Sequence, residues 1–508
     1  MTSDITPGIA PTPGPPGDPV GRHRTALTIS PDDLAGRAKS LLDKGYRVAL
    51  VAGHEDVGGM GLRAVYLFTA TDPDRRVELH VPVPRDRPAV PSLAGLSELA
   101  GRFEREMHDL FGIVTLGHPM PHRLVRHGHW PRGWYPMLDG AGEPPDFASS
   151  EVAAPVDESE VSLGPVHAGV TEPSRYRLTV EGERVTGVSG RLWYVHKGIE
   201  RLFQGRAPAA GVELAERVSG DTAVGHTLAY CLAVEDACGH EVSPDVQRIR
   251  AILLELERLY NHAADLGGLC GDAGHDVLDA HAQRIREELV RVNDEVTGHR
   301  LLRGAIHPGG VSVRRLPDPE RLAGFAAEVA TLVELALESS VVLDRFTGTA
   351  VLTAEQAAAC DALGYVARAS GLTVDARHDH PFLPADLPRE YERTDGDVLS
   401  RFLARAAEFA DSVRLITALR ADGFDSSVEP PLARRTVEST GVGIVEGWRG
   451  TIVHRAELSA DGVLTRVKIV DPSFVNWAAL SPALTGIDVA DFPLANRSFN
   501  LSLAGNDL

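Results

Sequence analysis

Sulfur is scarce in this chain of 508 residues, which contains four cysteines and five methionines. The cysteines stand far apart, at Cys231, Cys238, Cys270 and Cys360. They form no C-x-x-C pair of the kind that holds zinc or an iron–sulfur cluster. Isolated cysteines among Ala and Leu usually behave as small buried hydrophobes. We therefore expect a reduced, cytoplasmic protein without a metal site built on its own cysteines.

Long apolar runs and an excess of positive charge are also missing. No segment approaches the ~18 uninterrupted apolar residues that a membrane-spanning helix needs, so membrane association is expected to come through partners. The formal net charge of -20 argues against a nucleic-acid partner, because neutralising phosphates takes clustered Lys and Arg. Hydrophobic residues make up 43% of the chain, which is ordinary for a globular protein and is ample for a core.

Composition and patterning divide the chain into four parts. Residues 1–28 are rich in Pro, Gly and Thr and are predicted to be a disordered leader. Residues 29–138 predict an α+β domain, and 139–162, rich in Gly, Pro and acid, predict a linker. Residues 163–508 predict a mainly α-helical domain with small β excursions.

Periodicity predicts the main elements of both domains. In the first domain one helix and three strands are expected over 34–42, 47–52, 64–68 and 77–83. In the second domain long amphipathic helices are expected over 247–266, 282–296 and 398–419. The segment 322–343 is apolar almost all round and predicts a helix buried on most sides. Alternation between residues 442 and 470 predicts a small sheet.

A charged motif marks the first domain. The run from Phe103 to Ile113, FEREMHDLFGI, is followed by Gly117-His118-Pro119. It resembles the signature E-R-E-x-x-D-x-x-G-I, then G-H-P, of the C subunit of bacterial NADH:quinone oxidoreductase (complex I). The resemblance implies docking and assembly rather than chemistry. Its charged residues are then expected to form a surface or interface network: Glu104, Arg105, Glu106 and Asp109.

Motifs throughout the second domain point to a second family. They occur in this order: Gly164-Pro165-Val166-His167, Glu172-Pro173, Tyr194 to Glu200, Glu257-Arg258, Asn261-His262, Pro308 to Val311, Glu446 to Gly450 and Pro472 to Trp477. Each block resembles the family that unites the complex I D subunit with membrane-bound hydrogenase large subunits. C-like and D-like modules fused in one chain resemble the large subunits of formate hydrogenlyase and hydrogenase-4.

Two further segments resemble the metal-ligand motifs of nickel–iron hydrogenases, but without sulfur. Glu216 to His226 resembles E-R-V-C-G-x-C-x-x-x-H, and the last nine residues resemble D-P-C-x-x-C-x-x-R, with Asn500-Leu501 at the usual Asp-Pro and Leu508 at the final Arg. The four thiolate positions hold Ser219, Thr222, Ser502 and Gly505. Hydroxyls or a glycine cannot replace soft thiolate donors for nickel. We therefore predict a degenerate cavity with no metal.

The resemblance also implies roles for residues around this cavity. Glu172 aligns with the Glu that passes protons, and Arg449 aligns with the Arg that sits over the metal. His226 would lie just behind the ligand positions, and His167 and Asp507 would complete the cavity. Burial and hydrogen bonding can move the pKa of a Glu or His toward working pH, so Glu172, His226, Arg449 and Asp507 are candidate proton-relay or cavity residues. The alternative is that they satisfy one another as a structural ion-pair network.

Quinone binding receives little support from the residues. Complex I grips the quinone head group in the same cavity with a His and a Tyr. By counting from neighbouring motifs, these donors fall on Thr171 and Gly220 in this chain. Quinone therefore stays possible but unsupported as a ligand.

The resemblance implies an electron-transfer subunit of a membrane-associated complex of the NADH:quinone oxidoreductase or hydrogenase-4 type. Such a subunit would dock a small iron–sulfur subunit that holds a 4Fe-4S cluster, with antiporter-like membrane subunits below. It would bind no cofactor directly, because nicotinamide oxidation belongs to other subunits. It would lie on the inner face of the cell membrane. The alternatives are a catalytically silent scaffold, a proton-coupling element of that complex, or a stand-alone soluble enzyme.

Overall fold

The computed structural model describes residues 24–56, 61–143, 159–167, 172–384, 387–388, 391–420 and 437–508. Within these ranges, no helix is long and apolar enough to cross a membrane. Most of the predicted leader lies outside the described residues, but its last five residues, Arg24–Thr28, form strand β1. Most of the predicted linker also lies outside them.

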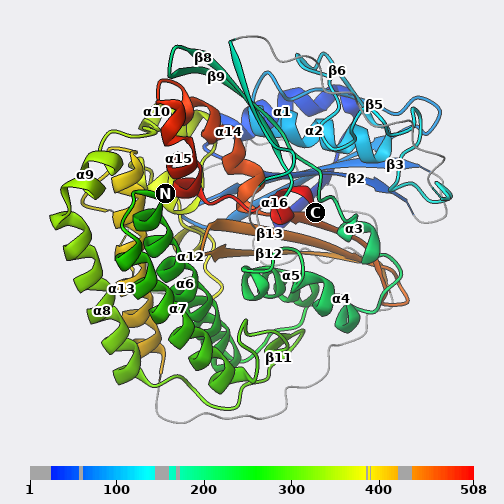
Figure 1. The fold of residues 1–508 in the computed structure, drawn as a ribbon. Coiled ribbons are helices and arrows are strands. Elements are labelled where there is room, and N and C mark those ends of the chain that lie inside the picture. The colour runs from blue at the N-terminus through cyan, green and yellow to red at the C-terminus, as the bar shows by residue number, and fades with distance from the viewer. Residues whose placement is uncertain are drawn as a thin grey trace.

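The first domain is a mixed four-stranded sheet with two helices. Its strands are β1, β2 (Arg47–Glu55), β3 (Leu62–Ala70) and β4 (Arg75–Val83), in the order β1-β4-β3-β2. β1 runs parallel to β4 and the other pairs are antiparallel. Helices α1 (Leu34–Leu42) and α2 (Glu98–Phe111) lie on one side of the sheet (Figure 1). The helix and three strands predicted for this domain are confirmed.

Within the described residues, the second domain contains two three-stranded antiparallel sheets. The first comprises β7 (Glu160–Leu163), β8 (Arg175–Glu181) and β9 (Arg184–Arg191). The second comprises β12 (Ser439–Gly447), β13 (Gly450–Leu458) and β14 (Leu464–Val470), which confirms the predicted β excursion. Helix α5 (Ala223–Cys238) packs against β12. Gly443 permits this close packing, since a Cβ there would lie 2.0 Å from the Ala229 carbonyl oxygen.

Long helices form the rest of this domain. They are α6 (Pro244–Asp272), α7 (Asp276–Thr297), α8 (Pro319–Glu338) and α13 (Val398–Leu419), and they lie side by side (Figure 1). Helical expectations for 247–266, 282–296 and 398–419 are confirmed, as is the α+β then mainly α fold class.

The helix expected over 322–343 departs from the prediction. Ser339 ends α8 and caps the short helix α9 (Ser340–Phe346). Only one face of α8 is buried, through Leu322, Phe325, Val329, Leu332 and Ala336. The prediction of a helix buried on most sides is wrong, because exposed Ala, Val and Leu are common on protein surfaces and do not mark burial.

Shorter elements complete the chain. The helices are α3 (Ile199–Leu202), α4 (Pro208–Ala215), α10 (Ala354–Ala359), α11 (Gly364–Ala369), α12 (Ala376–Asp379), α14 (Pro472–Leu484), α15 (Phe492–Phe499) and α16 (Leu503–Asp507). Two short strand pairs are β5 (Ala89–Pro91) with β6 (Val114–Leu116), and β10 (Ile306–His307) with β11 (Gly310–Val311). Single 3-10 turns occupy Pro31–Asp33 and Val489–Asp491.

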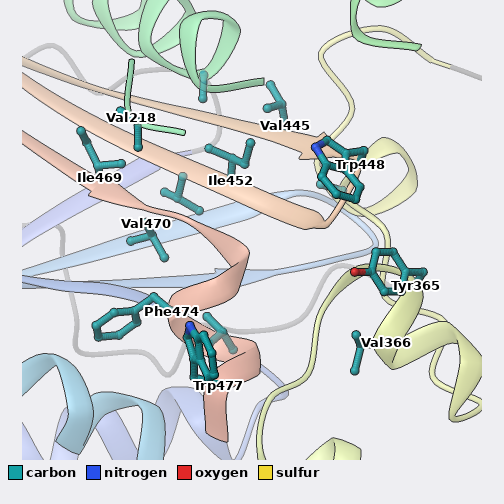
Figure 2. Close-up of a cluster of buried hydrophobic side chains, with 14 of the residues drawn as sticks. Val218, Tyr365, Val366, Val445, Trp448, Ile452, Ile469, Val470, Phe474 and Trp477 are labelled. Atoms are coloured by element: carbon teal, nitrogen blue, oxygen red, sulfur yellow. The ribbon is translucent and has the colours of Figure 1, made fainter. Parts of the chain in front are cut away.

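A shared apolar core joins the two domains. Figure 2 shows Ile452, Ile469 and Val470 of the second sheet above Phe474 and Trp477 of α14. From the first domain, the Phe103 ring stacks on the Phe474 ring with centroids 4.6 Å apart. The two domains therefore pack as one body around the sheet that ends at α14.

Buried ion pairs cross the same interface. Lys468 on β14 donates to Glu106 on α2 at 2.7 and 2.9 Å and pairs with Glu200 at 3.2 Å. Burial raises the pKa of Glu106. Although burial opposes it, Arg466 and Lys468 hold the pKa of Glu200 at about 2. The charges of this cluster are thus nearly balanced away from water.

The charged motif of the first domain is largely internal. Glu104 accepts from the Leu93 N–H at 2.7 Å, and Asp109 accepts from three backbone N–H groups over 124–126. Of the four residues only Arg105 lies partly at the surface, where it donates to the His122 carbonyl. The prediction of a surface network is therefore wrong for Glu104 and Asp109, because those carboxylates hold loops of their own domain together. Glu106 serves an interface within the chain.

Candidate functional site

The two segments that resemble hydrogenase ligand motifs meet in space. Ser219 lies in the turn before α5, and Ser502 caps α16 at the C-terminal end. Their hydroxyl oxygens are 2.8 Å apart, within one hydrogen bond, although 283 residues separate them. The Ser502 hydroxyl also accepts from the Gly505 N–H at 2.9 Å. We call this meeting point, together with the side chains described below, the junction.

Asp221 is the centre of the junction. Its carboxylate accepts from the Ser219 and Thr222 hydroxyls at 2.9 and 3.0 Å. Arg449 donates to both of its oxygens, at 2.8 and 2.7 Å, which is the paired geometry that Arg makes best. Burial opposes ionisation, yet Arg449 holds the pKa of Asp221 at about 2. The Asp221 side chain is 39% exposed, so the junction reaches the surface here.

Arg449 links the two motif segments through the hairpin between β12 and β13. Its guanidinium lies 3.9 Å from the centroid of the Trp448 ring, and its Nε donates to the Asn500 carbonyl at 2.5 Å. Trp448 Nε1 donates to the Asp221 carbonyl at 3.0 Å. The Arg predicted from resemblance therefore neutralises an aspartate and ties the C-terminal tail to the turn before α5.

Behind the turn lies a buried chain of an aspartate and two histidines. His226 Nε2 is 2.9 Å from Asp471 Oδ2, and His226 Nδ1 is 3.0 Å from His454 Nε2. Burial opposes it, but the hydrogen bond from His226 lowers the pKa of Asp471. Burial and the neighbouring His226 lower the pKa of His454. We name Asp471, His226 and His454 the relay.

The glycine at the fourth ligand position has no room for a side chain. A Cβ on Gly505 would lie 2.4 Å from Asp471 Oδ2 and 2.5 Å from its carboxyl carbon. Real Cβ atoms do not approach other atoms this closely. The Asp471 carboxylate thus fills the space in which a side chain at 505 would have to begin.

The remaining predicted residues have separate positions. Glu172 is exposed and accepts from the Ala504 N–H of α16 at 3.0 Å, which places it at the rim of the junction. Asp507 is buried and accepts from the Val195 N–H at 3.1 Å, and burial raises its pKa. Among the described residues, the hydrogen bonds of His167 go to Ser174.

Of the two positions expected for the quinone donors, the structure describes only Gly220. Thr171 lies outside the described residues. At Gly220, a Cβ would meet no atom within 4 Å among the described residues, so that position is open space.

Sequence reasoning missed Asp221, His454, Asp471 and Lys197. Lys197 Nζ lies 3.4 and 3.3 Å from the Val218 and Ala504 carbonyl oxygens, beside both motif segments. It belongs to the run from Tyr194 to Glu200, whose pattern indicated the family but no role for the lysine. Asp221 stands inside the first motif, where its acidic character was a readable signal. Nothing local in the sequence distinguishes His454 or Asp471.

The donor set does not fit a nickel–iron centre. Three hydroxyls stand at the thiolate positions, two of which bond to each other, and the fourth position has no side chain. Within the described ranges, no group of three His, Cys, Asp or Glu side chains could hold a metal ion.

A groove of about 780 Å³ lies elsewhere, between the first domain and α5. It is lined by polar and apolar side chains that include Arg76, Asp236, His240, His380 and Phe382. None of its lining residues belongs to the junction.

The hydroxyl contact between the two motif segments gives a first prediction. Ser219→Ala and Ser502→Ala should each lower the free energy of unfolding by about 1 kcal/mol, because each removes a hydrogen bond in a buried place. The double variant should cost less than the sum, since both singles break one shared bond. Urea unfolding of all three variants measures this. Ser481→Ala, whose hydroxyl donates to the Val188 carbonyl, should add independently to Ser219→Ala. Strict additivity of the first pair would contradict the contact.

Comparison with known proteins gives a consistent result for both domains. Residues 27–140 match the family described as "Respiratory-chain NADH dehydrogenase, 30 Kd subunit", and residues 272–428 match the "49 Kd subunit" of the same enzyme. Formate hydrogenlyase subunit 5 of Escherichia coli (strain K12) is 31% identical over 471 residues, which is 88% of this chain and 82% of that protein. Hydrogenase-4 component G of the same organism is 31% identical, covering 77% of this chain and 71% of that protein.

A respiratory relative and a solved structure extend the comparison. The fused C/D subunit of the NADH-quinone oxidoreductase of Bacteroides thetaiotaomicron is 27% identical, over 85% of this chain and 88% of that protein. A chain in the structure of the membrane-bound sulfane sulfur reductase, an archaeal respiratory membrane complex, superposes with a TM-score of 0.62 at 23% identity. It covers 70% of this chain and all of that chain, and shows a shared fold.

Proposed function

Because this chain belongs to the family of formate hydrogenlyase subunit 5, hydrogenase-4 component G and the fused C/D subunits of NADH-quinone oxidoreductase, we propose a specific role for it within an oxidoreductase complex. It is an electron-transfer subunit of a membrane-associated complex, it docks a small iron–sulfur subunit, and its junction holds no nickel–iron centre. The observation that carries the last point is the pairing of Gly505 with Asp471, where a carboxylate fills the space of the fourth ligand side chain.

The surface at the junction supports docking. Glu172, Lys197 and Asp221 are wholly or partly exposed there and form a rim of mixed charge. Polar, partly charged rims are typical of the edges of protein–protein interfaces. The small subunit with its 4Fe-4S cluster would cover this rim, since it is the part of the junction that reaches the surface. Antiporter-like membrane subunits would hold the assembly on the inner face of the membrane.

The second candidate is a proton-coupling or purely structural subunit of the same complex. It is favoured by the way the junction closes on itself: Asp221 is satisfied by Arg449, Ser219 and Thr222, and the relay is tied internally. Such self-satisfied polar groups stabilise a fold without needing a ligand. The two candidates differ in whether substitutions in the junction change the turnover of the assembled complex.

Metal analysis of the native complex tests the proposal. We expect iron and acid-labile sulfide from the small subunit, and nickel far below one atom per copy of this chain, because hydroxyl donors do not hold it. The complex should retain its composition after treatment with a nickel chelator. Formate hydrogenlyase, prepared and analysed in parallel, controls for loss of metal during purification. Stoichiometric nickel that copurifies with this chain would refute the metal-free junction.

A further inference from the structure

The relay is the most deeply buried ionisable group of the junction. His226 and His454 have no exposed surface, and Asp471 is 1% exposed. They come from three different elements: α5, β13 and the residue that caps α14. Buried ionisable side chains are costly unless paired, so three of them in a row call for an explanation beyond packing.

The relay can adopt two protonation states while its heavy atoms keep the same positions. In the first, His454 Nε2–H donates to His226 Nδ1, and His226 Nε2–H donates to Asp471. His454 Nδ1 is then bare, and among the described residues it has no hydrogen-bond partner.

In the second protonation state, an added proton binds His454 Nδ1, and the proton on His454 Nε2 passes to His226 Nδ1. One N–H bond forms at His454 Nδ1 and one at His226 Nδ1, and one N–H bond breaks at His454 Nε2. His226 becomes an imidazolium whose two N–H groups point to Asp471 and His454, while His454 stays neutral in its other tautomer. The charge of the relay changes from one negative to zero, so a proton is held without moving a side chain.

The surroundings of the relay determine how well it can hold that proton. From α5, Tyr230 faces His454 with ring centroids 6.4 Å apart. From the β12–β13 hairpin, Arg449 acts on Asp471, as does Lys197 from the segment before α3. From α14, the Ser473 N–H donates to Asp471 Oδ1 at 2.7 Å. Arg449, Lys197 and the Ser473 N–H favour an ionised Asp471, which is the counter-charge that a protonated His226 needs.

The absence of a side chain at Gly505 is what allows the Asp471 carboxylate to take its place in the relay. Its missing side chain leaves the volume that Asp471 occupies, as the 2.4 Å approach of an added Cβ demonstrates. A side chain at 505 would push the carboxylate away from His226. The glycine at the fourth ligand-equivalent position therefore leaves the space that the Asp471 carboxylate needs in order to contact His226.

We propose that Asp471, His226 and His454 form a proton-binding relay beside the junction, with the Asp471 carboxylate seated where a fourth ligand side chain would begin. The relay rests on the proposed function in one respect, the absence of a metal at that place. It supplies a buried proton acceptor behind the turn that carries Ser219 and Asp221. The three residues of the relay are positioning residues that hold a proton.

The test is to observe the protonation of the ring directly. We would label the histidines of the full-length chain with nitrogen-15 and follow their side-chain resonances between about pH 5 and pH 8. His226→Gln identifies the signal of His226 by its disappearance. We expect a wild-type signal with protons on both ring nitrogens near neutral pH. In Asp471→Asn, which keeps size but loses charge, the relay should release its proton about 1–3 pH units lower.

Asp74→Asn is the matched control, because Asp74 pairs with His380 at 2.8 Å outside the junction. It should leave the His226 signal unchanged. Gly505→Ala is a second, independent variant, and it should shift the release in the same direction by displacing the carboxylate. The relay is refuted if His226 is a neutral ring throughout the range in the wild type. It is equally refuted if both Asp471→Asn and Gly505→Ala titrate like the wild type.

The outcome is separable from that of the proposed function. Stoichiometric nickel in the native complex would overturn the metal-free junction whatever the histidine signals show. A neutral His226 in a nickel-free preparation would remove the relay and leave the docking role intact. In the complex, Asp471→Asn should also move the pH profile of turnover to lower pH while Asp74→Asn does not, a difference that a purely structural role would not produce.

Discussion

Glu408→Gln is expected to lower the free energy of unfolding by about 3–5 kcal/mol, because it removes the shared anion of a buried cluster of cations. Glu408 on α13 has no exposed surface and accepts from Arg258, His262 and Arg368 at 2.5–3.3 Å. Burial opposes its ionisation, but Arg368 and His262 hold the pKa of Glu408 well below its usual range. Glutamine keeps the shape of Glu408 and loses the negative charge that Arg258 and Arg368 require.

Glu408→Gln should also change the structure of the junction. Arg258 donates to the carbonyls of Glu446 and Gly447 at 2.8 and 3.1 Å, directly before Trp448 and Arg449. Loosening Arg258 therefore loosens the hairpin that aims Arg449 at Asp221. We expect the indole of Trp448, now 1% exposed, to become accessible to a fluorescence quencher in Glu408→Gln.

Urea unfolding of the full chain measures the stability change. Glu287→Gln is the matched control, since Glu287 also pairs with two arginines, Arg291 and Arg300, but on an exposed helix surface. Exposed pairs contribute little, so its unfolding midpoint should stay close to that of the wild type. Equal losses from both substitutions would show that the cluster around Glu408 is not what holds α13 in place.

Lys468→Met should destabilise the chain in a strongly pH-dependent way. Lys468 is 2% exposed and is the cation between Glu106 and Glu200, so methionine leaves Glu106 buried without its partner. The pKa of Glu106 is already raised by burial and should rise further. An acid whose folded pKa lies above its unfolded value destabilises the fold progressively as pH rises above the unfolded value.

The loss in free energy of unfolding should therefore be about 3–5 kcal/mol at mildly alkaline pH. It should shrink as the pH falls toward the pKa of an ordinary Glu, because protonated Glu106 needs no counter-ion. Thermal or urea unfolding across this range gives the profile. Lys39→Met, which removes one partner of the exposed Lys39–Asp43 pair, should show no such slope. A loss that is independent of pH would mean that Lys468 acts through packing and not through charge.

Local patterning predicted much of the fold. Apolar runs and alternation located β2, β3, β4 and the sheet of β12 to β14, and amphipathic spacing located α6, α7 and α13, whereas the sheet of β7, β8 and β9 was not predicted. These features are readable because side-chain periodicity reports which face of an element is buried. The same logic failed for α8, where apolar residues occur on the exposed side as well as on the buried face. Composition cannot separate those two faces when small and apolar side chains occupy both.

The site was only half predictable. The resemblance placed Ser219, Thr222, Ser502 and Gly505 at equivalent positions, and the structure brings the two segments within one hydrogen bond. It placed Glu172 in a cavity, whereas the structure holds it exposed at the rim. His226 was predicted to lie just behind the ligand positions. Its partners were not predicted, because His454 and Asp471 lie 228 and 245 residues further along the chain.

The sequence by itself determined which atoms are available at the four ligand positions: three hydroxyls, one bare backbone and no sulfur. Donor chemistry is a property of residue type and needs no coordinates. Only the tertiary structure decided what lies beside these positions, since Asp471 reaches Gly505 and His226 through the packing of α14 and α16 against α5 and β13. Contacts between distant segments depend on how elements pack, and no local pattern in a single chain encodes them.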